Sequence, residues 1–128
     1  MSKLELIILP ERREELARKL SVDPEIAKEV SRMGLSMEPP GSDREIRFAE
    51  YLENMKISTD TLKGSADKAK MQRELKMLLE DKIWKERGLN LISLVKDRLE
   101  RNRVEYTHLD ALVIAFLIAR IIILGKMW

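Results

Sequence analysis

The sequence predicts an all-α fold, and three observations support this prediction. Apolar residues recur three and four positions apart along most of the 128-residue chain. Helix-start signals, in which Asp, Ser or Thr precedes Pro or an acidic residue, stand before these segments. Strand signals are nearly absent, and the run LELIIL at residues 4–9 is the only strand candidate. We therefore expect about six helices in a single domain, residues 1–128.

Residues 1–36 are expected to form a charged helical hairpin, an N-terminal arm. Pro and Glu at residues 10–11 open its first helix, to about residue 20, because Pro suits the first turn and an acid suits its positive end. The run Asp-Pro-Glu at residues 23–25 opens the second helix, and Gly34 closes it.

Residues 37–60 are expected to form a linker and a short third helix. The run MEPPGS cannot continue a helix. Ser42 and Glu45 then match a capping box, which predicts a helix to about residue 56. Residues 57–65 read as a loose connector.

Residues 61–128 are expected to form a C-terminal helical bundle. A long fourth helix is predicted at residues 66–87, and a glycine separates it from a fifth that ends near residue 103. Thr107 and Asp110 cap the sixth helix, which ends the chain.

The sixth helix is apolar on every side, since residues 111–124 contain only one polar side chain, Arg120. A membrane span is disfavoured, because 14 residues cover about 21 Å of the roughly 30 Å of hydrocarbon. It is either the central helix of a single-chain bundle or a helix whose burial neighbouring subunits complete.

We favour burial shared between subunits, because a chain of this size is expected to leave a large apolar patch exposed. Aromatic and methionine side chains at a terminus are also typical of interfaces. The predicted subunit-interface residues are Leu112, Phe116, Ile118, Ile121, Ile122, Leu124, Met127 and Trp128.

Catalytic chemistry is not expected. The chain has no cysteine, and its single histidine, His108, has only Asp110 as a plausible partner. Adjacent acidic pairs such as Glu80 and Asp81 point to different sides of a helix, so they do not converge on a metal ion. We expect neither an enzyme nor a cofactor.

Basic side chains indicate a phosphate-binding surface, although they are equally typical of solvated helices in proteins from hot habitats. Residues 61–108 hold twelve basic and eight acidic side chains, a net charge of +4. The predicted DNA-binding residues are Arg12, Arg13, Arg18, Lys19, Lys28, Arg32, Lys63, Lys68, Lys70 and Arg73.

Residues 15–30, ELARKLSVDPEIAKEV, also resemble a helix-turn-helix motif. However, Ser21 stands where that motif usually has glycine, and Glu25 and Glu29 on the second helix would repel phosphates. A small dimeric regulator and a helical adaptor of a protein complex therefore remain alternatives.

The whole chain resembles the capsid proteins of filamentous archaeal viruses, most of all the Pyrobaculum filamentous virus (tristromavirus) type. The likeness is organisational: a charged hairpin, PERREELARKLSVDPEIAKEVSRMG, a break, MEPPGS, and an apolar last helix, LDALVIAFLIARIIILGKMW. In that family an N-terminal arm wraps A-form double-stranded DNA and C-terminal helices pack subunits into a filament. Two related coat proteins can pair, and some members wear a lipid envelope.

This resemblance implies a structural coat protein that polymerises into a helical virion and protects double-stranded DNA without sequence specificity. Its partners would be DNA, copies of itself and a related second coat protein, with any membrane contact made without a spanning helix. It would be assembled in the host cytoplasm and located in the virion.

Overall fold

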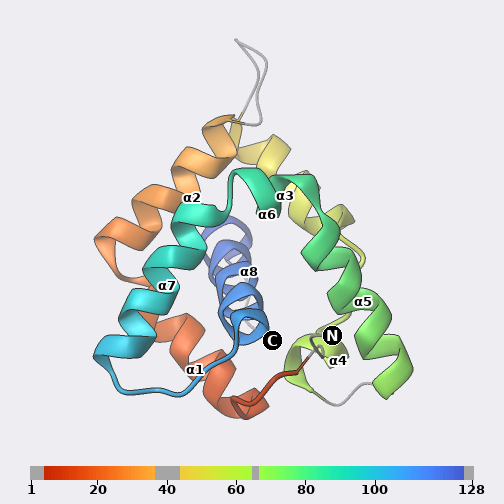
Figure 1. The fold of residues 1–128 in the computed structure, drawn as a ribbon. Helices are drawn as coiled ribbons and strands as arrows, with labels where there is room; N and C mark the ends of the chain where they lie inside the picture. Colours follow the sequence, from red (N-terminus) through yellow and green to blue (C-terminus); the bar gives the residue numbers. More distant parts are fainter. Residues whose placement is uncertain (1–4, 37–43, 65–66, 126–128) are drawn as a thin grey trace.

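The computed structural model describes residues 5–36, 44–64 and 67–125, and only the backbone of residues 44–46. Within these ranges the chain forms helices and no strand (Figure 1), so the predicted all-α class is confirmed. The described helices number eight, where about six were expected. They are α1 (Pro10–Ser21), α2 (Pro24–Ser36), α3 (Arg44–Asn54), α4 (Thr59–Lys63), α5 (Lys68–Glu80), α6 (Lys82–Glu86), α7 (Leu89–Arg101) and α8 (His108–Leu124).

The two additional helices begin at side-chain caps that the sequence analysis did not recognise as helix starts. Residues 57–65, expected to be a loose connector, contain α4, whose N-terminus is capped by the Ser58 hydroxyl. The single helix expected over residues 66–87 is divided at Asp81. The backbone of Asp81 is extended, and its carboxylate accepts hydrogen bonds from two N–H groups in the first turn of α6. At both places a capping side chain starts a separate helix, although the apolar spacing along residues 66–87 is that of one continuous helix.

The second helix does not end at Gly34 but continues to Ser36. Gly34 is buried, and a Cβ atom there would lie 3.0 Å from Cδ2 of Phe48 on α3. The missing side chain therefore allows α2 and α3 to pack closely. The capping box expected at Ser42 and Glu45 lies outside the described side chains.

The strand candidate does not form a strand over its described residues, 5–9. This segment is held instead by α8, because the N–H groups of Ile7 and Ile8 donate to the Asp110 carboxylate at 3.2 and 3.3 Å. The Thr107 hydroxyl also donates to the Glu5 carbonyl oxygen, at 2.8 Å. The N-terminal segment is therefore an extended strap across the start of α8.

The helix α8 runs through the centre of the molecule, and the other helices surround it (Figure 1). It packs against α1, α2, α3 and α7, and Trp84 of α6 lies against Phe116 with ring centroids 5.5 Å apart. Residues 109–120 are all buried by this one chain. Within the described helices, seven others provide apolar stripes where five were expected. Over these residues α8 is therefore the central helix of a single-chain bundle. Our preference for a helix whose burial is completed by neighbouring subunits is wrong for residues 109–120.

The N-terminal hairpin belongs to the bundle and does not project from it as an arm. The helix α1 packs along α8, and α2 packs against α7 and α3. Leu16, Ala17, Ile26 and Val30 are buried in the common core. The two helices predicted for the hairpin are present, but their apolar faces are buried in the core of the bundle.

Candidate nucleic-acid interface

Three of the predicted DNA-binding arginines form ion pairs within their own helix. Arg12 pairs with Glu15, Arg18 with Glu14 at 3.0 Å and Arg32 with Glu29 at 3.0 Å. Each pair places a carboxylate beside the guanidinium, which weakens the attraction for a phosphate. The remaining predicted cations of this hairpin that stay exposed are Lys19 and Lys28.

Arg13 cannot contact DNA, and its assignment is corrected. Its side chain is only 2% exposed, and its Nη2 lies close to Gly64 beneath the end of α4. Burial lowers the pKa of Arg13, while the charge of Asp110 acts in the opposite direction. Position 13 lies on the same face of α1 as Leu16 and Leu20, so helical spacing already places it on the buried side.

The outer face of α5 carries several exposed basic side chains. Lys68, Lys70, Arg73 and Lys76 are exposed on it, while Leu75 and Leu78 are buried beneath. This helix lies at the edge of the molecule and packs mainly against α4 and α6 (Figure 1). Its outer face is therefore free of covering helices.

The acidic side chain in the middle of α5 is turned away from this basic face. Glu74 accepts hydrogen bonds from the Ser58 N–H group at 2.8 Å and from the hydroxyls of Ser58 and Thr61. Burial would raise the pKa of Glu74, but these hydrogen bonds outweigh it and lower the pKa. The carboxylate thus stays ionised while it joins α5 to α4.

Lys63, which was grouped with the α5 cations as a DNA-binding residue, does not lie on α5. It ends α4, and its side chain is half-buried. Lys82 and Lys85, which were not among the predicted DNA-binding residues, are exposed on α6. The signal that was missed is Asp81, a cap residue that starts a new helix.

The helix-turn-helix alternative meets an obstacle at the start of α2. A reading helix contacts bases with its N-terminal residues. In this protein those residues include Asp23 and Glu25, which pair with Arg98 of α7 at 2.9 and 2.8 Å. The end of α2 that would enter the groove of DNA is therefore acidic and tied to the bundle.

The predicted interface residues divide into three groups. Leu112, Phe116 and Ile118 are at most 2% exposed, so they are corrected from interface to core residues. Ile121, Ile122 and Leu124 are partly buried against the core and keep some exposed surface. Met127 and Trp128 lie outside the described residues.

Within the described residues, no group of three or more His, Cys, Asp or Glu side chains is placed to hold a metal ion. No described helix is both long enough and apolar enough to cross a membrane. No known protein family, curated protein or solved structure matches this chain. The fold and the surface define an all-helical bundle around one apolar helix, with a cationic outer helix.

Proposed function

We propose that this protein is a structural coat subunit that binds double-stranded DNA without sequence preference, through the outer face of α5. The observation that carries the proposal is the excess of exposed basic side chains over exposed acidic ones on this helix. Lys68, Lys70 and Arg73 face solvent, while Glu74 is engaged with α4. Flexible cations on an uncovered helix suit contacts to phosphates, which position a protein without reading bases.

The small number of basic side chains on the outer face of α5 suits weak contacts that are repeated by many subunits along one duplex. One subunit that neutralises a few phosphates binds weakly, and neighbouring subunits on the same duplex add their contacts. A coat made in this way needs folded subunits before assembly, and the self-contained core supports this order of events. The filament itself is the part of the proposal that comes from the family resemblance.

The test compares two triple variants in duplex binding over a range of salt concentrations. In Lys68→Ala/Lys70→Ala/Arg73→Ala, the slope of log affinity against log salt should fall by about 2–3, at roughly 0.9 for each lost phosphate contact. The matched control is Arg12→Ala/Arg18→Ala/Lys19→Ala on α1, where two of the arginines are already paired with glutamates. Its slope should stay close to that of the wild type.

An unchanged slope in the α5 variant, or a loss confined to the α1 variant, would remove α5 as the DNA surface. A preferred site that survives excess competitor DNA would favour a regulator. Absence of any duplex binding would favour the adaptor. Electron micrographs of the protein with and without DNA test the coat role, which predicts filaments when DNA is present.

A further inference from the structure

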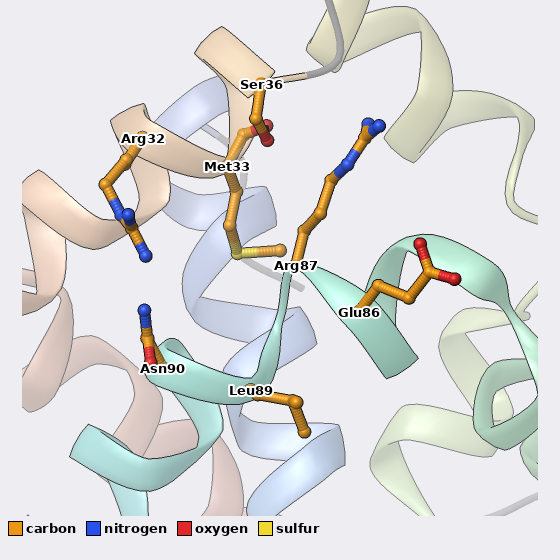
Figure 2. Close-up of a pocket in the computed structure, with 7 residues that line it drawn as sticks. All are labelled: Arg32, Met33, Ser36, Glu86, Arg87, Leu89 and Asn90. Carbon is orange, nitrogen blue, oxygen red and sulfur yellow. Dashed lines mark hydrogen bonds between the residues drawn. The ribbon is translucent and has the colours of Figure 1, made fainter.

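A groove of about 250 Å³ lies between the end of α2 and the junction of α6 and α7, within the part of the chain that the structure describes. The polar side chains around it do not converge, since Arg87 points away from Arg32 and Asn90 (Figure 2). Arg32 is also paired with Glu29 at 3.0 Å. Polar groups do converge at another place, the junction of α4 and α5.

At this junction α4 holds the carboxylate of an α5 side chain. The Oε2 atom of Glu74 accepts hydrogen bonds from the Ser58 N–H group at 2.8 Å, from the Ser58 hydroxyl at 3.0 Å and from the Thr61 hydroxyl. Thr61 is completely buried, and Glu74 is half-buried. Because a free glutamate side chain samples several rotamers, these donors determine where the carboxylate stays.

Lys70 lies one helical turn before Glu74, at the spacing that brings two side chains of a helix together. The positive charge of Lys70 helps to lower the pKa of Glu74, so the two groups are within electrostatic range. The hydrogen bonds of Glu74 go to α4, however, and the side chain of Lys70 is exposed. A carboxylate released from α4 would therefore lie beside one of the cations assigned to the DNA-binding face.

We infer that Ser58 and Thr61 are positioning residues for the DNA-binding face of α5, because they hold Glu74 on α4 and keep Lys70 available for a phosphate. This inference rests on the proposed function. A released Glu74 would pair with Lys70 within the helix, as acidic and basic side chains already pair on α1 and α2. The paired ammonium would then attract a phosphate less strongly.

The test uses Ser58→Ala/Thr61→Val, which removes both hydroxyls without changing any charge. For duplex DNA, the slope of log affinity against log salt should fall by about 0.9, the value for one lost phosphate contact. Adding Glu74→Gln to this variant should restore the wild-type slope, because the competing charge is gone. A purely structural role of the two hydroxyls predicts no such rescue.

Two further variants protect this comparison against damage to α4. Thr61→Val alone keeps the Ser58 cap of α4 and faces Glu74 with a methyl group, so its slope should also fall. Thr59→Val is the matched control, since Thr59 is a half-buried threonine of the same helix that does not donate to Glu74. Its slope should equal that of the wild type.

A measurement without DNA separates this inference from the proposed function. In an NMR titration, the pKa of Glu74 should lie closer to its ordinary value in the double variant, because the α4 donors that lower it are gone. The side-chain resonances of Lys70 should follow that titration more strongly than in the wild type. If the wild type binds no duplex, the proposed function fails, while this stronger response of Lys70 still shows that α4 keeps Glu74 from it.

Three results would overturn the inference. The Lys70 resonances could respond equally in the wild type and the double variant. The double variant could bind duplex DNA with the wild-type slope. The triple variant with Glu74→Gln could keep the lower slope of the double variant.

Discussion

Asp110 joins three parts of the chain through one buried carboxylate. Its oxygens accept hydrogen bonds from the N–H groups of Ile7, Ile8 and Thr107, at 3.2, 3.3 and 2.9 Å. The buried Arg13 provides the opposing positive charge. The aspartate predicted as a helix cap therefore also fixes the N-terminal strap and balances the charge of a buried arginine.

Replacement of Asp110 by Asn should destabilise the fold by about 3 kcal/mol, because it removes charged acceptors and leaves Arg13 buried without its counter-charge. Urea unfolding followed by circular dichroism measures this loss. Asp60→Asn, at an exposed position in the first turn of α4, is the control and should change the free energy of unfolding by less than about 0.5 kcal/mol. A loss of similar size in both variants would contradict the bridging role of Asp110.

At the scale of elements, Arg98 fastens α7 to the start of α2. Its guanidinium binds Asp23 at 2.9 Å and Glu25 at 2.8 Å. The hydrogen bond from Arg98 lowers the pKa of Asp23, helped by the backbone N–H group of Ile26. The Asp23 carboxylate thus acts both as the cap of α2 and as an anchor to α7.

This pair predicts a loss of stability in acid. Because the pKa of Asp23 is lowered by folding, its contribution is present above the ordinary pKa of about 3.9 and is lost as the pH falls through the lower folded value. Asn keeps the capping oxygen without the charge, so Asp23→Asn should be less stable than the wild type at pH 7. Below about pH 4 the difference should shrink. Urea unfolding at several pH values measures it, and a difference that stays constant into acid would argue against the ion pair.

The elements that the sequence predicts well are those with local signals. The starts of α1 and α2 and the capping box of α8 follow from single residues within one turn. The division at Asp81 was missed because the apolar spacing continues across it. That spacing does not show that the Asp81 backbone is extended and that its carboxylate caps a new helix. Exposure of the basic residues was equally hard to read, because Glu74 could have neutralised the α5 face had Ser58 and Thr61 not engaged it.

At the scale of the whole molecule, the apolar last helix determines the architecture. Its composition correctly indicates burial on every side, but composition does not say whether the covering helices belong to the same chain. The answer depends on how many separate helices the rest of the chain makes. The breaks at Ser58 and Asp81 raise that number, and the described helices cover residues 109–120 without help. In the coat that we propose, association is then a step between molecules that are already folded.

The most direct test of this account is the thermal unfolding midpoint, Tm, of DNA-free protein at two concentrations about a hundredfold apart. A core completed within one chain predicts the same Tm at both concentrations, since no association is coupled to folding. Sedimentation should show a folded monomer under the dilute condition. A Tm that rises with concentration, or a dilute protein that is unfolded, would show that α8 needs neighbouring subunits after all.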